Sequence, residues 1–478
     1  MLAKVFSSAL IGIDACPIEV EVDIARGLPT FSTVGLPDNA VKESKDRVKA
    51  AIKNSGYEFP AKRITVNLAP ADIKKEGSSF DLPMAVAILA AEGLVDGDGG
   101  NRFLIAGELS LDGRVKPIRG ALSMAAAARE RGIQGVIVPK ENEREAALVE
   151  GITVIGVENL PQLVELLNGT TSIPPCTIDT DEYFKNIGED DLDLNEVKGQ
   201  EHVKRAMEVA AAGGHNMVMI GPPGSGKTML ARRLPSLLPG MSVEEAIETT
   251  KIHSVAGILQ EGEALITVRP FRNPHHTISD AGLIGGGQIP RPGEVSLAHN
   301  GILFLDEMPE FRKNVLEVLR QPLEDGVVTI SRAAISLTYP SRFMLVGAMN
   351  PCPCGYLGDG QKECNCTPLQ LQRYRAKISG PLLDRIDIHC EVPAVRFREL
   401  SSDGSGESSH DVRERVHRAG KVQGERFSGK RIHINSQMTN RHIKQFCAVD
   451  SDGMRLLETA IDRLGLSARA YTRILKVA

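Results

Sequence analysis

Apolar and polar positions alternate along the first part of the chain with two different periods. A helical period predicts an amphipathic helix over residues 40–54, and an almost unbroken apolar run predicts a buried helix over residues 81–94. β-branched residues, alternating with polar ones or in short runs, predict strands at residues 18–23, 64–68, 136–138 and 154–157. Residues 1–170 are therefore expected to form an α/β domain.

Two polar stretches divide the rest of the chain. Residues 171–194 are acidic and rich in proline, which predicts a linker, and residues 401–410 (SSDGSGESSH) predict a second, flexible one. Between them, residues 195–400 alternate strand, loop and helix patterns, and residues 411–478 are helical in pattern. The pattern breaks off at residues 476–478 inside an apparent helix, so we expect a truncated chain or a shortened reading frame.

A glycine-rich loop lies between an apolar run at residues 217–220 and a helical pattern at residues 229–234. It has the spacing G-x-x-x-x-G-K-T and consists of Gly221, Pro222, Pro223, Gly224, Ser225, Gly226, Lys227 and Thr228. Glycines let backbone N–H groups turn toward phosphates, Lys227 adds a positive charge, and the Thr228 hydroxyl can bind Mg²⁺. An ordinary turn is the weaker alternative in this setting, so the sequence predicts binding of ATP and Mg²⁺.

Two further apolar strands end in polar side chains. Residues 302–305 are followed by Asp306, expected to hold Mg²⁺, and by Glu307, expected to polarise the attacking water. Asn350 follows a strand pattern at residues 343–349 and can orient that water. The alternatives are an acidic turn at the first strand end and a capping role for Asn350.

Two arginines are candidates for stabilising charge on the γ-phosphate. Arg385, in the run LLDRID, can reach the nucleotide of a neighbouring subunit, or can form a local ion pair with Asp384 or Asp387. Arg469 lies in the helical C-terminal part and can contact phosphates from a lid, or can be a surface residue. Both are therefore predicted catalytic residues.

Four of the eight cysteines are close together in the sequence: Cys352, Cys354, Cys364 and Cys366. Four thiolates on the short loop 350–368 suit a closed, tetrahedral Zn²⁺ site. Unpaired structural thiols and transient disulfides are the alternatives. A zinc site here would stiffen the chain between Asn350 and Arg385.

Composition narrows the class of protein. The 478 residues are 42% apolar and 24% charged, with a net charge of −5, so any surface for a polyanion must be local. The longest apolar stretch, residues 82–95, is interrupted by Glu92 and is shorter than the roughly 20 residues of a membrane-spanning helix. One lysine and an early Asp14 do not match a secretory signal. A cytoplasmic protein with no membrane contact is expected.

Local positive charge offers three candidate DNA contacts. Residues 412–445 carry nine Lys and Arg and two Glu, on either a solvated helical face or a DNA-binding one. Residues 327–337 predict a hairpin whose Arg332 can follow phosphates in a central pore, or an ordinary surface hairpin. His275 and His276 are adjacent and so do not share one face, which favours DNA or subunit contacts over a metal.

These motifs resemble the magnesium-chelatase-like branch of AAA+ ATPases, and nearly the whole chain resembles the YifB/ComM family. The segments that carry the resemblance are residues 27–44, 62–83, 269–276, 282–287, 291–298 and 350–355. The resemblance implies a P-loop AAA+ core with a C-terminal helical lid, and a homohexameric ring with ATP between protomers. It also implies single-stranded or branched DNA as a partner, with recombination proteins, in natural transformation.

The N-terminal domain also resembles the Lon protease fold, which is of the ribosomal S5 domain 2 type. Residues 107–142 match a Lon pattern, and residues 75–79 place Ser79 at the position of the nucleophile. The lysine base of that family belongs where this chain has Ala121, Leu122 and Ser123. A hydroxyl nucleophile needs a positioned base, so we expect this fold without proteolysis.

Three functions are therefore compared. An ATP-driven DNA translocase, acting as a branch-migration helicase, is favoured by the family resemblance. A chelatase-like motor subunit that remodels a protein partner is the alternative, and it is disfavoured by the Lon-like domain. An ATP-dependent protease is disfavoured by the missing lysine.

Overall fold

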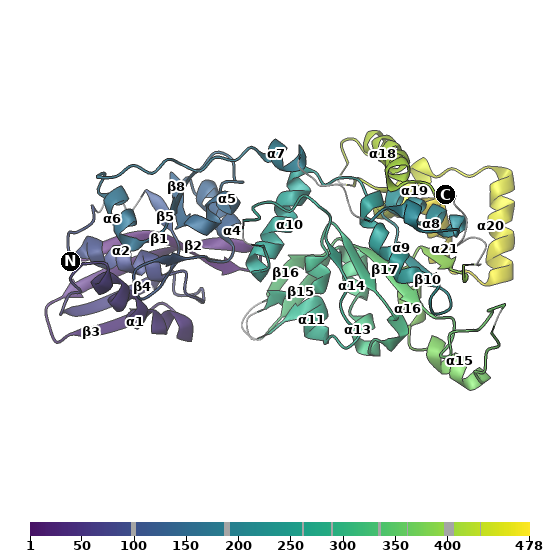
Figure 1. Cartoon of the computed structure of the whole chain (residues 1–478), viewed down its shortest axis with the longest axis horizontal. Helices are drawn as coiled ribbons and strands as arrows, with labels where there is room; N and C mark the ends of the chain where they lie inside the picture. Colours follow the sequence, from purple (N-terminus) through teal and green to yellow (C-terminus); the bar gives the residue numbers. More distant parts are fainter. Residues whose placement is uncertain are drawn as a thin grey trace. The chain divides into compact units, whose positions relative to one another are not determined.

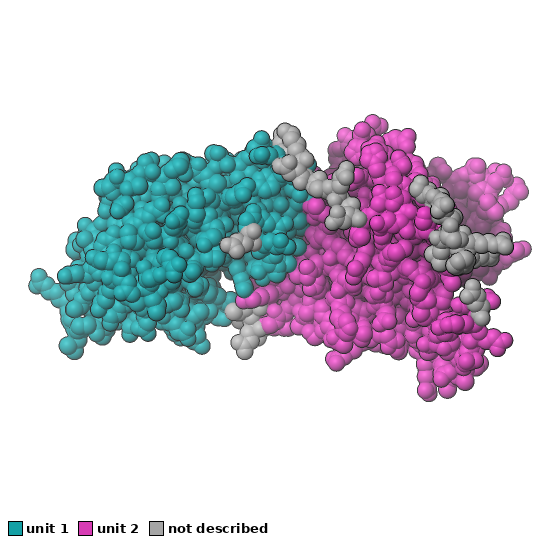
Figure 2. Space-filling model, viewed as in Figure 1, with its two compact units in different colours: residues 1–186, 243–267 teal, residues 187–242, 268–478 magenta. Residues whose placement is uncertain are grey.

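The structure is a computed structural model of the whole chain. It describes residues 1–96, 102–185, 192–260, 262–287, 290–332, 336–360, 362–395, 406–430 and 432–478. Contacts divide the chain into two compact units, coloured separately in Figure 2: unit 1 contains residues 1–186 and 243–267, and unit 2 contains residues 187–242 and 268–478. Unit 1 combines helices with a mixed sheet, and unit 2 combines helices with a parallel main sheet, which confirms the predicted α/β fold class.

Unit 1 contains the strands and helices labelled in the purple-to-blue part of Figure 1, together with α10. Its strands are β1 (Leu2–Ile11), β2 (Asp14–Ala25), β3 (Thr30–Val34), β4 (Arg63–Ala69), β5 (Phe103–Ile105), β6 (Glu108–Leu109), β7 (Val115–Lys116), β8 (Gly135–Pro139) and β9 (Thr153–Val157). Its helices are α1 (Asn39–Asn54), α2 (Asp81–Ala91), α4 (Ala121–Glu130), α5 (Glu143–Ala146), α6 (Leu160–Leu167), α7 (Thr180–Lys185) and α10 (Val243–Ala256), with a 3-10 turn at Lys140–Asn142.

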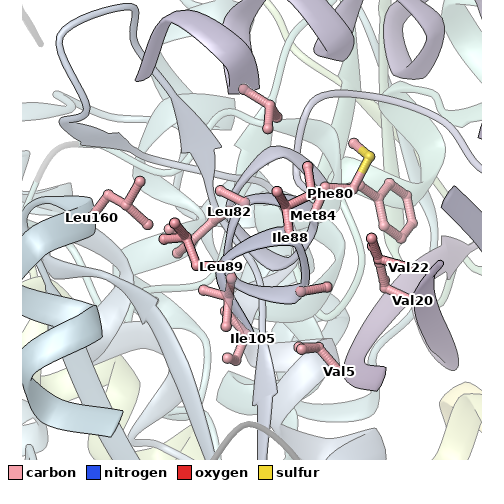
Figure 3. Close-up of a cluster of buried hydrophobic side chains, with 14 of the residues drawn as sticks. Val5, Val20, Val22, Phe80, Leu82, Met84, Ile88, Leu89, Ile105 and Leu160 are labelled. Atoms are coloured by element: carbon pink, nitrogen blue, oxygen red, sulfur yellow. The ribbon is translucent and has the colours of Figure 1, made fainter. Parts of the chain in front are cut away.

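A seven-stranded sheet in the order β3-β4-β2-β1-β5-β8-β9 is the centre of unit 1. Helix α2 packs on β1 and β2, and almost all of its side chains are buried, as Figure 3 shows for Leu82, Met84 and Ile88. Burying each such side chain stabilises the fold by about 1.5–3 kcal/mol. The predicted helix 81–94 ends at Ala91 instead, because Gly93 adopts a left-handed φ of +76°.

Helix α10 and the residues after it belong to unit 1, although the sequence analysis assigned them to the segment 195–400. The helix packs on α4, and the Ser254 hydroxyl donates to the carboxylate of Glu145. The same hydroxyl accepts a hydrogen bond from the Gly120 N–H at 2.8 Å. These buried contacts explain why the segment lies with unit 1.

The first predicted linker is only partly a linker. Residues 186–191 lie outside the described residues, and α7 forms within the predicted stretch 171–194. The second prediction, residues 401–410, extends too far at its C-terminal end. There Ser408 caps α18 (Ser409–Arg426), and Ser409 is buried with its hydroxyl accepting from the Leu194 N–H at 2.8 Å. Residues 401–405 lie outside the part of the chain that the structure describes.

Unit 2 contains the remaining elements of Figure 1. Its strands are β10 (Met217–Ile220), β11 (Phe271–Arg272), β12 (Gly285–Gly286), β13 (Arg291–Pro292), β14 (Ile302–Leu305), β15 (Val327–Ser331), β16 (Ser336–Pro340), β17 (Met344–Met349) and β18 (Ile388–Glu391). Its helices are α8 (Glu201–Gly213), α9 (Lys227–Arg233), α11 (Asp280–Ile284), α12 (Glu294–Leu297), α13 (Lys313–Glu317), α14 (Arg320–Asp325), α15 (Pro368–Arg375), α16 (Gly380–Leu383), α18, α19 (Asn440–Phe446), α20 (Ser451–Leu464) and α21 (Ala468–Val477), with 3-10 turns at Leu194–Glu196, Pro235–Leu237, Met308–Glu310 and Asn435–Gln437.

The main sheet of unit 2 is parallel throughout, in the order β11-β14-β17-β10-β18. Its three central strands, β14, β17 and β10, are short apolar runs buried on both faces, as expected for a parallel sheet covered by helices. Because all strands run the same way, their carboxyl ends meet at one edge, where ligands bind in open α/β sheets. No helix among the described residues is long and apolar enough to cross a membrane.

Candidate nucleotide-binding site

Three strand ends bring the predicted nucleotide residues to the same edge of the unit 2 sheet. The glycine-rich loop follows β10, Asp306 follows β14, and Asn350 follows β17. Strand β17 pairs with both other strands, so it lies between them. The strand order therefore places Asn350 between the loop and Asp306.

The glycine-rich loop has a backbone that only glycines adopt easily. Gly224 and Gly226 have φ values of +78° and +86°. At Gly221, a Cβ would lie 2.0 Å from the Val392 carbonyl oxygen, so a side chain would displace the adjoining chain. Helix α9 begins directly after the loop, at Lys227.

The ammonium group of Lys227 is held inside the loop. It donates to the carbonyl oxygens of Gly221 at 2.8 Å and Pro222 at 2.9 Å, and lies 3.3 Å from Oδ1 of Asn350. Burial lowers the pKa of Lys227, because the charged form loses hydration. Anionic phosphate oxygens would restore that lost stabilisation of charge, so this lysine suits a triphosphate ligand.

The residues predicted to hold Mg²⁺ are in direct contact. The Thr228 hydroxyl donates to Oδ2 of Asp306 at 2.7 Å, and the other oxygen of Asp306 accepts from the Glu307 N–H at 2.9 Å. Mg²⁺ prefers oxygen ligands and usually uses one or two carboxylates with phosphate and water. The donor set therefore fits Mg²⁺ bound together with nucleotide phosphates.

Glu307 has an unusual backbone and an unexpected neighbour. Its φ is +49°, a left-handed value that is costly for a residue with a side chain and is common at functional sites. One carboxylate oxygen lies 3.8 Å from Nδ1 of His276. The ring of His276 lies 4.1 Å from that of His275 between centroids, tilted by 33°, and meets Phe311 edge-on. His276 was predicted to make DNA or subunit contacts, and its place beside Glu307 was not predicted.

Gln200 is a second residue that sequence reasoning missed. It has a φ of +58°, is buried, and donates from Nε2 to the carbonyl oxygens of Ser225 at 2.8 Å and Pro393 at 3.0 Å. It therefore ties the glycine-rich loop to the chain after β18. A lone glutamine before a helix offers no motif, so the sequence contained no usable signal.

The two predicted arginines contact the same carboxylate, that of Glu324. Arg385 is buried and its guanidinium pairs with Glu324, while Arg469 lies 3.7 Å from the same carboxylate. The local alternatives do not form, because Asp387 pairs instead with His215 and Arg473. Among the described residues, no polar contact joins these arginines to Lys227, Thr228 or Asp306.

The four clustered cysteines converge, and we call them the cysteine cluster. Their sulfur atoms all lie within 4.8 Å of one another, and the Cys352–Cys354, Cys352–Cys364 and Cys354–Cys364 sulfur distances are 3.3, 3.7 and 3.6 Å. None is in a disulfide. A backbone hydrogen bond from Tyr356 lowers the pKa of the Cys354 thiol to about 6. Sulfur ligands in this arrangement can hold a soft metal ion.

The candidate DNA contacts are only partly described. Strands β15 and β16 form the predicted hairpin, whose exposed Arg332 lies near the Gly287 carbonyl oxygen; residues 333–335 lie outside the described chain. In the basic stretch 412–445, Arg415 is engaged by Glu208 and Glu407, whereas Arg413 and Arg418 are exposed. Arg431 is not among the described residues.

In unit 1, the position of the missing lysine base is filled by the start of α4. There the Ser123 hydroxyl donates to the Ile13 carbonyl oxygen at 2.5 Å. Lys75, in the loop before Ser79, is fully buried and its ammonium group contacts the Pro70 carbonyl oxygen. Burial lowers the pKa of Lys75. The absence of proteolysis stays a prediction.

Comparison with known proteins covers nearly the whole chain. Residues 20–142 match the family described as subunit ChlI of Mg-chelatase, residues 193–400 match magnesium chelatase, subunit ChlI, and residues 406–478 match its C-terminal part.

Individual relatives match over similar lengths. Competence protein ComM of Haemophilus influenzae is 45% identical over 100% of this chain and 92% of its own length. The uncharacterized protein YifB of Escherichia coli is 44% identical with the same coverage. The magnesium-chelatase 38 kDa subunit of Rhodobacter capsulatus is 25% identical over 42% of this chain and 59% of its own length. The chain has a phosphate-binding loop and the Thr228–Asp306 pair suited to Mg²⁺, and it matches these relatives over its full length. The chain therefore belongs to the YifB/ComM family of magnesium-chelatase-like AAA+ ATPases.

Proposed function

We propose that this chain is an ATP-driven DNA motor that works as a homohexameric ring in the cytoplasm. In this proposal it is a branch-migration helicase that acts on single-stranded or branched DNA with recombination proteins, in natural transformation. The single observation that carries the motor part is the separation of the site into two groups. Lys227 contacts Asn350 and Thr228 contacts Asp306, whereas Arg385 and Arg469 share Glu324.

Each group has a chemical role in the proposed ATPase cycle. Lys227 binds phosphate oxygens, and Thr228 with Asp306 holds Mg²⁺, which neutralises charge on the phosphates. Glu307 polarises the attacking water, and Asn350 orients it. Arg385 of one protomer, with Arg469 beside it, stabilises the charge on the nucleotide of the next protomer.

The DNA part of the proposal rests on the named relative and on local positive charge. A relative at 45% identity bears the name competence protein. Exposed Arg332 on the β15–β16 hairpin and exposed arginines on α18 are suited to phosphate contacts. Neither feature carries information about base sequence.

The test is the ATPase rate with no DNA, with single-stranded DNA and with forked DNA, in the wild type and in Lys227→Ala. We expect DNA to stimulate the wild type, and branch migration to be lost in Lys227→Ala together with ATP binding. Stimulation by a protein partner alone would support the alternative, a chelatase-like motor subunit that remodels a protein. That alternative is favoured by the family matches over all three segments.

We further propose that the cysteine cluster holds a structural Zn²⁺. A tetrahedral site with Zn–S bonds of about 2.3 Å places its sulfurs about 3.8 Å apart. The observed distances of 3.6 and 3.7 Å are close to this value, and the third, Cys352–Cys354, is shorter at 3.3 Å. The Cys354 N–H also points to the Cys366 sulfur at 3.4 Å, as backbone donors do around zinc thiolates. One zinc per protomer is expected in reduced protein, and a stoichiometry near zero would contradict the proposal.

A further inference from the structure

The loop that carries the cysteine cluster is built onto the nucleotide site. It starts at Asn350, whose side chain lies 3.3 Å from the Lys227 ammonium group. It leads into α15, where the buried Tyr374 makes a hydrogen bond with the backbone of Asn350. Both ends of the loop therefore meet at the residue that faces the phosphate lysine.

The middle of the loop touches the phosphate-binding loop itself. Gly355, which directly follows the cluster residue Cys354, has a φ of +88°, and a Cβ there would lie 2.6 Å from Cδ of Pro223. Pro223 is one of the x positions of G-x-x-x-x-G-K-T. A displacement of Cys354 would therefore alter the packing of Gly355 against the loop that binds phosphate.

Little else holds this segment in place. Residues 350–360 and 362–367 contain no helix or strand, so no backbone ladder fixes their conformation. Cys352 is fully buried, while the other three cluster residues are partly exposed. A metal that joins four side chains supplies the missing cross-links, because its binding free energy becomes folding free energy of the loop.

We propose that zinc bound in the cysteine cluster holds the phosphate-binding loop in place, as a brace. The affinity for nucleotide then depends on whether the cysteine cluster is occupied by zinc. This inference rests on the zinc proposal above. The brace acts through the contact of Gly355 with Pro223 and through Asn350. The cysteines are thus positioning residues, and none of them touches the nucleotide.

The first experiment removes a ligand. Cys364→Ser is compared with Cys176→Ser, which changes a cysteine outside the cluster, in the intact chain. Zinc per protomer and the Kd for a fluorescent ADP with Mg²⁺ are measured on the same samples. We expect Cys364→Ser to lose zinc and to raise the Kd about tenfold or more, which corresponds to about 1.4 kcal/mol. Cys176→Ser is expected to retain both properties.

The second experiment separates the brace from the metal and from general misfolding. Gly355→Ala and Gly358→Ala add the same methyl group at similar φ values, +88° and +79°, on the same loop. Only the first meets Pro223, because nothing lies within 4 Å of a Cβ at Gly358. Both variants should retain zinc, and Gly355→Ala should raise the Kd for ADP several-fold relative to Gly358→Ala.

The outcomes distinguish the two proposals. Zinc-free wild-type protein would overturn both the zinc site and the brace. Full zinc occupancy with equal nucleotide affinity in Gly355→Ala and Gly358→Ala would overturn the brace and leave the zinc site standing. Unchanged nucleotide affinity in a zinc-free Cys364→Ser would also overturn the brace. None of these results affects the ATPase assignment, which Lys227→Ala tests.

Discussion

Glu307 and His276 show how chemistry at single residues depends on neighbours from another strand. Glu307 has a left-handed backbone at the end of β14, and its carboxylate is directed toward His276, which follows β11. Strands β11 and β14 pair in parallel, so their ends bring these residues together. A partner at this distance can set the position of the Glu307 carboxylate, for which we propose the role of polarising a water molecule.

Replacing His276 is therefore expected to affect catalysis more than binding. His276→Ala should lower kcat of ATP hydrolysis about tenfold, because a misplaced catalytic group loses rate steeply, with little change in KM. His276→Asn, which keeps a polar side chain, should recover part of the loss. Steady-state ATPase kinetics measure both parameters.

The neighbouring histidine supplies the control for this prediction. Nδ1 of His275 shares a hydrogen bond with the Thr277 hydroxyl at 2.9 Å, and in the described part of the chain Glu307 pairs with His276 and not with His275. His275→Ala should therefore leave kcat within a few-fold of wild type. Equal losses in both alanine variants, with no recovery in His276→Asn, would show that the pair acts only through packing.

At the scale of elements, α10 is fixed to unit 1 by a buried carboxylate. Glu145 accepts hydrogen bonds from the Leu122 N–H at 3.0 Å, from Nδ2 of Asn142 at 3.1 Å and from the Ser254 hydroxyl. Burial nonetheless raises the pKa of Glu145 above its ordinary value of 4.5, because desolvation outweighs these hydrogen bonds. The charged form is therefore disfavoured in the folded state.

This shift predicts how stability depends on pH. A carboxyl whose folded pKa is raised contributes stability fully below its unfolded pKa, and loses it as pH rises through the folded pKa. Glu145→Gln removes this titration, so the melting temperature of the variant relative to wild type should increase as pH rises above 4.5. Melting curves across that range measure the difference.

Glu141→Gln is the matched control, because Glu141 is exposed and lies four residues before Glu145 in the chain. Its melting temperature should follow that of wild type at every pH. If the Glu145→Gln and Glu141→Gln curves kept a constant separation across the range, the buried carboxylate would not be the titrating group.

At the scale of the whole molecule, the proposed function makes ATP hydrolysis a property of neighbouring chains. On the proposed function, Lys227 binds the nucleotide of its own protomer, whereas Arg385 serves the next one. The buried pairing of Arg385 with Glu324 leaves its Nε without a hydrogen-bond partner among the described residues.

A mixing experiment tests this division. Lys227→Ala and Arg385→Ala should each be inactive alone, but equal mixtures should regain roughly a quarter of wild-type ATPase, since that share of interfaces in a random ring is intact. The rate is measured after mixing at concentrations that permit exchange of protomers. Inactive mixtures, with assembly confirmed by light scattering, would show that Arg385 does not act between chains.

Patterns within short segments of the sequence were sufficient to predict many of the helices and strands. The helix over 40–54, the strands and the glycine-rich loop follow from periodicity and backbone chemistry that act within a few residues, and they appear at nearly the expected positions. The adjacency of Lys227, Thr228 and Asp306 also follows, because a phosphate loop and a strand-end carboxylate belong to one known arrangement.

Contacts between distant residues depended on tertiary structure. The order of the strands places His276 beside Glu307, and the packing of α10 places it in unit 1. Arg385 forms its ion pair with Glu324 and not with a neighbouring aspartate. Each of these depends on which apolar surfaces bury one another, and that is decided by the whole chain at once. The sequence by itself determined which chemical groups are present and the local structures that carry them, whereas the fold decided which of them meet.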